Sequence, residues 1–124
     1  MRIFVTRWFE KFAIKKKVST YQLCEAIARA ELGLINAQLG GGLIKQRVAR
    51  KGEGRSGGFR TVIAHRTGVH AIFLYGFGKN ERDNIDVDDF EDLKKTASIL
   101  LTYGKDELAR AVAAGELKEI VCHA

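Results

Sequence analysis

The stretch FRTVIAHRTGVHAIFLYGFGK, residues 59–79, decides the fold of this chain. It contains two runs rich in β-branched and aromatic residues, 59–66 and 69–79, separated only by Thr67 and Gly68. Two such runs joined by two residues that include a glycine are typical of a β-hairpin. The run 69–79 is the more apolar of the two, so we predict that it lies at the centre of a sheet.

The N-terminal segment predicts a strand followed by two helices. Residues 2–6 are rich in β-branched types, and Thr6 stands where a helix N-cap is expected. Ser19 and Gln22 have the spacing of a capping box, which marks the start of a second helix and so predicts a helical hairpin. Three aromatic residues of the first helix recur at helical spacing and are assigned to the core: Trp8, Phe9 and Phe12.

The remaining segments predict further strands and helices. Residues 43–50 change to a period of two, which indicates a strand, between a glycine-rich break at 39–42 and a loop at 51–58. An acidic cluster within 86–92 marks a helix start, and another helix is expected over roughly 106–114. The tail after these helices is either a short strand or a frayed end.

The order strand, two helices, three strands, two helices predicts one α+β domain over residues 1–124. Apolar residues make up 46% of the chain, which is enough to form a core. The formal net charge is +6 and the sequence pI is about 9.5. Such a basic domain suits a nucleic acid, an anionic membrane or an acidic protein partner.

Other sequence features exclude several classes of protein. Cys24 and Cys122 lack metal-ligand spacing, so we expect free thiols in a reducing cytoplasm, and we expect no metal and no cofactor. The N-terminus lacks the apolar centre of a signal peptide, and no apolar run approaches the roughly 20 residues of a membrane span. A membrane is therefore not an expected partner. His65 and His70 are expected to face each other on the surface beside the hairpin turn.

The positive charge is concentrated in one part of the chain. Residues 43–82 contain nine Lys and Arg against two acids, Glu53 and Glu81, which gives +7. Residues 83–124 contain five Lys and Arg against ten acids, which gives −5. The predicted strands and their loops therefore carry the excess cations.

Hairpin geometry explains how Arg60 can stand in the middle of an apolar strand. A two-residue turn sets Arg60 opposite Tyr75 and Val62 opposite Phe73. Lys45 and Arg47 share one face of the strand 43–50. An unpaired charge is costly in a closed core, so the face of Arg60 is expected to be a partly open groove. Arginines in such a groove suit a phosphate backbone, and an aromatic ring can stack an unpaired base.

Three motifs in this order resemble the RelE-like toxins of type II toxin–antitoxin pairs, within the RelE/ParE superfamily. They are GGLIKQRVAR (41–50), GGFRT (57–61) and FLYGFGKNERDN (73–84). The resemblance implies a small twisted, mainly antiparallel sheet with an N-terminal helical hairpin and C-terminal helices. It also implies a bacterial ribonuclease that cuts messenger RNA on the translating ribosome and is neutralised by an antitoxin protein. Asn80 and Asp86 stand where some members carry an arginine and a tyrosine.

The candidate site residues follow from the charge pattern and from this resemblance. By resemblance, Arg60 matches the family's strand arginine, Lys45 and Arg47 match its basic strand pair, and Lys79 and Arg82 match its basic segment. We assign four residues to catalysis: Arg60, Lys45, Arg47 and Lys79. Four more are assigned to substrate binding: Arg50, Arg55, Tyr75 and Arg82.

The expected chemistry is metal-independent RNA cleavage. The 2′-hydroxyl of RNA is its own nucleophile, and Arg60 is expected to stabilise the charge that develops on the phosphate. Lys45 and Arg47 would position phosphates, and which residue acts as acid or base stays open. The alternative is a non-catalytic module of the same fold that binds nucleic acid or protein, such as a gyrase inhibitor, because fold alone does not decide the target.

Overall fold

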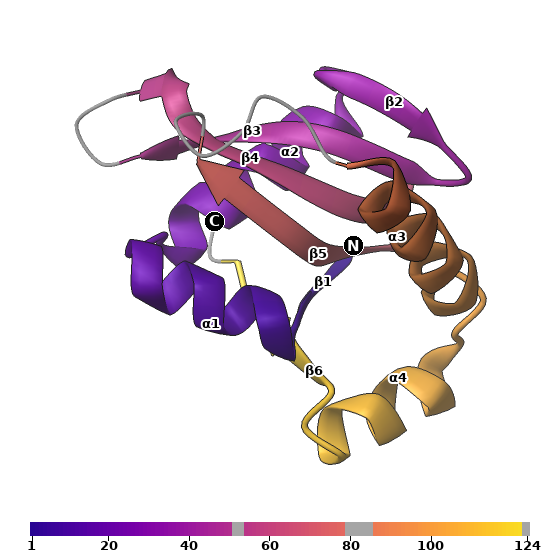
Figure 1. Cartoon of the computed structure of the whole chain (residues 1–124). Coiled ribbons are helices and arrows are strands. Elements are labelled where there is room, and N and C mark those ends of the chain that lie inside the picture. Colours follow the sequence, from indigo (N-terminus) through magenta and orange to yellow (C-terminus); the bar gives the residue numbers. More distant parts are fainter. Residues whose placement is uncertain (51–53, 79–85, 123–124) are drawn as a thin grey trace.

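The computed structural model describes residues 1–50, 54–78 and 86–122, with the backbone alone for residue 50 and for residues 54–57. Figure 1 shows the elements in chain order. They are β1 (Arg2–Thr6), α1 (Arg7–Lys16), α2 (Thr20–Glu31), β2 (Ala37–Gly40), β3 (Leu43–Arg50), β4 (Gly54–Arg66), β5 (His70–Gly78), α3 (Val87–Leu100), α4 (Lys105–Ala113) and β6 (Leu117–Ile120).

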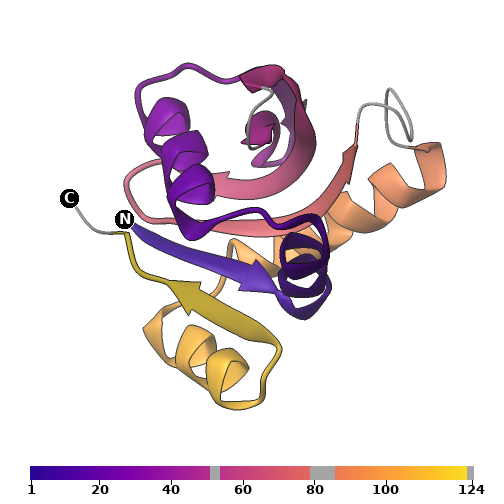
Figure 2. The ribbon, with the colours of Figure 1, turned by 90° about the vertical axis from the view of Figure 1, so that its left-hand side faces the viewer.

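The described strands form one mixed sheet in the order β2-β3-β4-β5-β1-β6. Only β1 and β5 pair in parallel, and the other neighbours are antiparallel. The hairpin of β4 and β5 lies at the centre, as the sequence predicts. Figure 2 shows β3 and β4 twisting away from β1. The α+β fold with a mainly antiparallel sheet is confirmed.

Two apolar cores lie on opposite faces of this sheet. The first includes Phe9 and Phe12 of α1 and Leu23 of α2, packed on strand residues such as Phe73. The second includes Leu100 of α3 and Leu108 of α4, packed on strand residues of the other face. The helical hairpin thus covers one face and the C-terminal helices cover the other.

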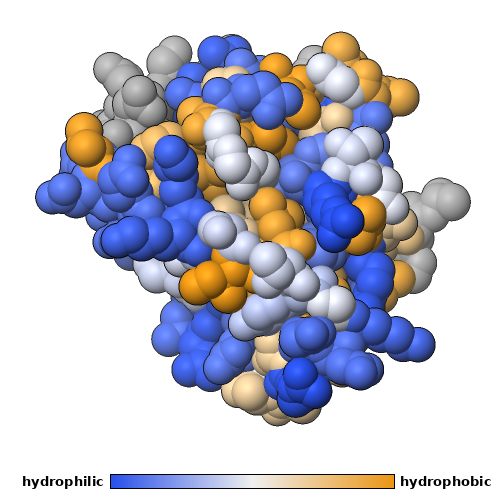
Figure 3. Space-filling model, turned by 90° about the vertical axis from the view of Figure 1, so that its right-hand side faces the viewer, coloured by the Kyte–Doolittle hydropathy of each residue, from blue (hydrophilic) through white to orange (hydrophobic). Residues whose placement is uncertain are grey.

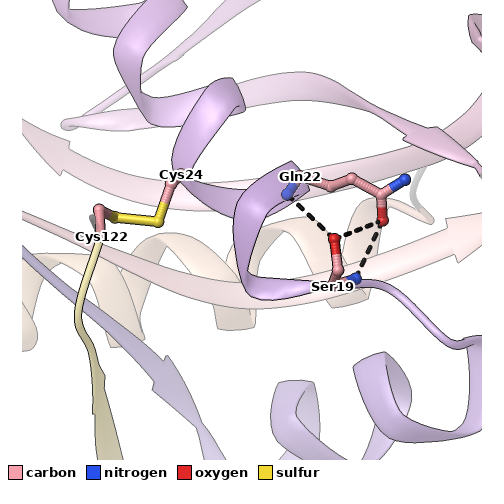
Figure 4. Close-up of a disulfide and its surroundings, with 4 residues drawn as sticks. All are labelled: Ser19, Gln22, Cys24 and Cys122. Atoms are coloured by element: carbon pink, nitrogen blue, oxygen red, sulfur yellow. Dashed lines mark hydrogen bonds between the residues drawn. A yellow bond between two sulfur atoms is a disulfide. The ribbon is translucent and has the colours of Figure 1, made fainter. Parts of the chain in front are cut away.

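Both N-terminal helices begin where the sequence places their caps. Thr6 is the N-cap of α1, and its side chain accepts a hydrogen bond from the backbone N–H of Phe9 at 3.2 Å. Ser19 and Gln22 form the predicted capping box at the start of α2, as Figure 4 shows. The sequence also predicts β3, β5, α3 and α4 to within a few residues.

Two strand predictions need correction, and of the two alternatives for the tail the strand is the one observed. The break predicted at 39–42 is partly wrong, because Ala37–Gly40 form β2 and only Gly41 and Gly42 make the turn into β3. Their φ angles of +63° and +81° are in the left-handed region that favours glycine. The predicted loop at 51–58 is shorter, because β4 already begins at Gly54. The tail forms β6, which pairs with β1.

The expectation of two free thiols is wrong. Cys24 of α2 and Cys122 form a disulfide with a Cα–Cα distance of 5.9 Å (Figure 4). The sequence gives no local signal for this disulfide, because the two cysteines are 98 positions apart. The pairing of β6 with β1 carries the C-terminal segment past α2 and brings the two sulfurs together.

Candidate nucleic-acid interface

Three cations share one face of β3 and β4, and we call Lys45, Arg47 and Arg60 the basic strand face. Arg47 lies directly opposite Arg60, and Lys45 lies opposite Val62, two positions along. Residues directly opposite or two apart on one face are neighbours, so the three side chains form one group. The predicted grouping of these cations is confirmed.

The backbone of Arg47 is held by groups outside the sheet. Its N–H donates to Asn36 Oδ1 at 2.8 Å, and its carbonyl oxygen accepts a hydrogen bond from Arg29 Nη2. Both polar groups therefore point away from β4. Arg47 and Arg60 thus form a non-hydrogen-bonded antiparallel pair, in which side chains approach more closely than in the alternating pair type.

Arg60 is half-buried in the middle of β4. Its Nη1 donates a hydrogen bond to the carbonyl oxygen of Gly58 at 3.2 Å. Phe77 of β5 lies across from it and is fully buried. The guanidinium of Arg60 is therefore oriented by a hydrogen bond within its own strand, beside Arg47.

The predicted register of the β4–β5 hairpin is wrong by two compensating shifts. Arg66 pairs with His70 rather than with Val69. This one-residue shift alone would move every side chain of β5 to the opposite face of the sheet. A bulge between Val62 and Ile63 adds a second shift, so Val62 pairs with Tyr75 and Arg60 with Phe77. Tyr75 and Phe77 therefore still lie on the face of Arg60, as predicted.

Tyr75 marks the border of the basic strand face. It is half-buried, and its ring centroid lies 6.1 Å from that of Phe77. On its other side it stacks on Trp8 of α1 at 4.6 Å between centroids. Tyr75 is thus part of an aromatic cluster that begins next to Arg60 and ends on a helix.

The rest of this sheet face is closed by apolar packing. Leu43, Val62 and Ala64 are fully buried in the same core as Leu100 of α3. Figure 3 shows that hydrophilic residues cover most of the outer side that α3 and α4 present, with smaller hydrophobic areas between them. Toward the other end of the same face, Arg47 is exposed and Arg60 is half-buried.

Four predicted site residues lie wholly or partly outside the described structure. Lys79 and Arg82 fall in the undescribed segment 79–85. Arg50 and Arg55 belong to β3 and β4, but their side chains are outside the described atoms. Among the described residues, no group of three or more His, Cys, Asp or Glu side chains is placed to hold a metal ion.

The predicted surface pair of His65 and His70 is wrong. Both side chains are buried, and the register sets His65 opposite Ala71. His65 Nε2 lies 2.6 Å from Glu31 Oε2, and Glu31 also accepts a hydrogen bond from the backbone N–H of Gly68. These contacts attach the hairpin turn to the end of α2.

A family model described as the RelE toxin of the RelE/RelB toxin–antitoxin system matches residues 1–120. This chain belongs to the RelE toxin family. The match spans every helix and strand described above. A search of curated proteins found no match.

Membership of the RelE family makes this chain a toxin of a toxin–antitoxin system, with an antitoxin as its partner. Within the described residues of the toxin, no helix is long and apolar enough to cross a bilayer. Asp86 is the exposed N-cap residue of α3.

Sequence reasoning on the toxin missed the position of Trp8. Helical spacing predicts that Trp8 belongs to the core, yet the residue is 47% exposed. Phe9 and Phe12 of the same helix are buried, as predicted. The spacing of lysines was the available signal, because Lys11 and Lys15 follow Trp8 at helical intervals and mark a solvent-facing side of α1.

Proposed function

We propose that this toxin is a metal-independent endoribonuclease that cuts messenger RNA on the translating ribosome. The observation that carries the proposal is the non-hydrogen-bonded pair of Arg47 and Arg60, with Lys45 on the same face. Like charges placed directly opposite each other destabilise a sheet, so their presence is explained by an anion that binds between them. RNA supplies such an anion in each phosphate.

The proposed reaction uses the RNA's own 2′-hydroxyl as the nucleophile. Its oxygen attacks the adjacent phosphorus, the bond to the 5′-oxygen breaks, and the products are a 2′,3′-cyclic phosphate and a 5′-hydroxyl. The proton of the 2′-hydroxyl leaves, and the 5′-oxygen takes up a proton. Lys45, Arg47 and Arg60 are cations and offer no ligand to a metal ion, but they suit the negative charge that grows on the phosphate.

The three cations receive different roles in this proposal. Arg60, fixed by its bond to Gly58, stabilises the developing charge. Arg47, with its backbone held from outside the sheet, binds a phosphate in two-point contact together with Lys45. Lys79, Arg82, Arg50 and Arg55 extend this set in the proposal. The ribosome and a cytoplasmic location follow from the choice of translated messages as the substrate.

Substitution of Arg60 tests the proposal. Arg60→Ala should lower the cleavage rate of ribosome-bound message by about 10²–10³-fold and abolish growth arrest, because the positioned guanidinium that stabilises the developing negative charge is lost. Primer extension on messages from cells expressing the toxin measures the cuts. Circular dichroism of the purified variant establishes that it is folded.

Arg66→Ala is the matched control, because Arg66 lies exposed at the far end of the same strand. It should cleave at the wild-type rate. Cleavage by Arg60→Ala at the wild-type rate would contradict the role of Arg60. DNA damage signalling without any cuts in messages would favour the non-catalytic alternative, a gyrase inhibitor.

A further inference from the structure

A second basic surface lies beside the first, on helix α1. An open cleft of about 500 Å³ lies between α1 and β5. Its walls are Trp8, Lys11, Phe12, Lys15, Lys16 and Tyr75. The cleft thus combines three aromatic rings with three lysines, and none of the described residues that line it is acidic.

Gly76 allows α1 to pack this closely on β5. A Cβ atom at this position would lie 2.6 Å from Cε1 of Phe12, which is too close for any real contact. β1 pairs with β5 only as far as Val5 and Phe73, and the chain then turns into α1. The helix therefore occupies the place beside β5 where β1 ends, as Figure 2 shows.

Trp8 presents a flat aromatic surface to solvent. Its ring stacks on Tyr75 with an interplanar angle of 28° and on Phe12 at 5.6 Å and 11°. Although two rings pack against it, 47% of the residue stays exposed. The packing fixes the orientation of the indole, so the exposed surface is already ordered before any ligand arrives.

The lysines give this aromatic surface a positive border. Lys11 and Lys15 are exposed, and they follow Trp8 at intervals of three and four residues along α1. Glu10, the acidic residue of this helix, is engaged elsewhere, because it pairs with Lys118 of β6 at 3.1 Å. A flat ring beside several cations fits a nucleobase with its neighbouring phosphates.

The cleft also continues the basic strand face. Tyr75 lines the cleft and lies opposite Val62, two residues along β4 from Arg60. A strand of RNA that passes Arg60 can therefore reach Trp8 by way of Tyr75. We propose that Trp8 and Tyr75 form a base-stacking subsite for single-stranded RNA, with Lys11 and Lys15 on the adjacent phosphates. This inference rests on the proposed function, because it assigns a further part of the same RNA strand.

Trp8 is itself the probe for a direct test, since it is the only tryptophan of the chain. The titration uses the folded Arg60→Ala protein, so that the RNA stays uncut, with 12-nucleotide oligoadenylate as ligand. Stacking of a base should quench the fluorescence of Trp8 in a saturable way. Inorganic polyphosphate of equal charge has no base to stack and should therefore leave most of the Trp8 fluorescence unquenched. Equal quenching by both ligands, or none by the oligonucleotide, would overturn the subsite.

Substitutions separate stacking from charge. In anisotropy titrations with a labelled oligonucleotide, Trp8→Leu should weaken binding about 10- to 100-fold, as expected for loss of one stacked base. Lys11→Ala and Lys15→Ala should each reduce the slope of log affinity against log salt by about 0.7. Lys105→Ala, an exposed lysine of α4 outside the cleft, is the matched control and should change neither quantity.

The subsite and the proposed function fail in different ways. If the wild-type toxin binds and quenches with RNA but cuts no message, the proposed function fails and the subsite stands. If wild-type protein cuts messages and Trp8→Leu binds and cuts equally well, the subsite fails and the proposed function stands. Quenching by oligoglutamate with no response to RNA would overturn the subsite in favour of an acidic protein partner.

Discussion

Arg47 and Arg60 show how a single residue pair connects stability with binding. Each strand is well formed around them, yet the pair places two positive charges opposite each other. In the proposed function, an anion that lies between the two side chains offsets this repulsion. Because Arg47 is exposed, salt screens the pair, and the proposed attraction for phosphate should weaken as ionic strength rises.

His70 is the residue for which the structure predicts a pH effect. It is 2% exposed, and its Nε2 has no hydrogen-bond partner among the described residues. Burial, together with the positive charges of Arg66 and Arg2, lowers the pKa of His70 below its usual value near 6.5. The folded protein therefore binds fewer protons than the unfolded chain as the pH falls below about 6.5.

We expect the free energy of unfolding to fall between pH 7 and pH 5, with a slope from this group of at most about 1.4 kcal/mol per pH unit. Urea unfolding of the wild type and of His70→Leu across this range measures the effect. The variant should lose less stability on acidification, because the titrating group is gone. Equal slopes in the two proteins would contradict this assignment. The hydrogen bond from Arg2 lowers the pKa of Glu119 below 4.5, so protonation of that carboxyl affects stability only below the range from pH 7 to pH 5.

At the scale of the elements, Gln46 connects β3 to the helical layer. Its side chain is fully buried, and its Nε2 donates to the carbonyl oxygens of Ala26 and Leu34 at 3.0 and 3.1 Å. Its Oε1 accepts a hydrogen bond from the backbone N–H of Asn36 at 2.9 Å. One amide thus satisfies three backbone groups between α2 and β2.

Gln46→Leu should lower the free energy of unfolding by about 2–4 kcal/mol, because the leucine removes the hydrogen bonds to the Leu34 carbonyl oxygen and from the Asn36 N–H, which lie outside the helix. Urea denaturation measures the change. Gln38→Leu on the neighbouring strand β2 is the control, since Gln38 is exposed and its replacement should change stability by less than about 0.5 kcal/mol. Equal effects of the two substitutions would show that the Gln46 hydrogen bonds contribute nothing.

The elements that sequence predicts well are those whose signals are local. The Thr6 and Ser19 caps and the alternation of residues 43–50 each depend on neighbours in the chain, and all three are confirmed. Register is a different problem, because nothing in the local sequence marks Leu74 of β5 as the extra residue of the bulge opposite Val62 and Ile63. Tyr75 still lies on the face of Arg60 because two shifts in the β4–β5 register cancel.

The exposed Trp8 could not be predicted from helical spacing alone. Large aromatic residues at core-like intervals usually pack inside, and Phe9 and Phe12 do so. Trp8 differs because β1 ends before it, so that its ring packs on Phe12 of its own helix and on Tyr75 at the edge of β5. That edge is known only once the sheet order is known, and the sheet order is a property of the whole chain.

At the scale of the whole molecule, the disulfide joins two distant parts of the chain. Cys24 lies in α2, and Cys122 lies just after β6, at the edge of the sheet. β6 is four residues long and is otherwise held by its pairing with β1. Disulfides are rare in a reducing cytoplasm, so the state of this bond is a testable property of the toxin.

Removal of the disulfide should lower the free energy of unfolding by about 3–5 kcal/mol, because the bond closes a loop of nearly the whole chain and restricts the unfolded state. The Cys24→Ser, Cys122→Ser double variant should melt below the oxidised wild type. Dithiothreitol should lower the melting temperature of the wild type toward that of the variant and leave the variant itself unchanged. Titration of free thiols in denaturant should give none for the oxidised protein and two after reduction. A wild type that titrates as two free thiols without reductant, and melts with the double variant, would show that β6 is held by its strand pairing alone.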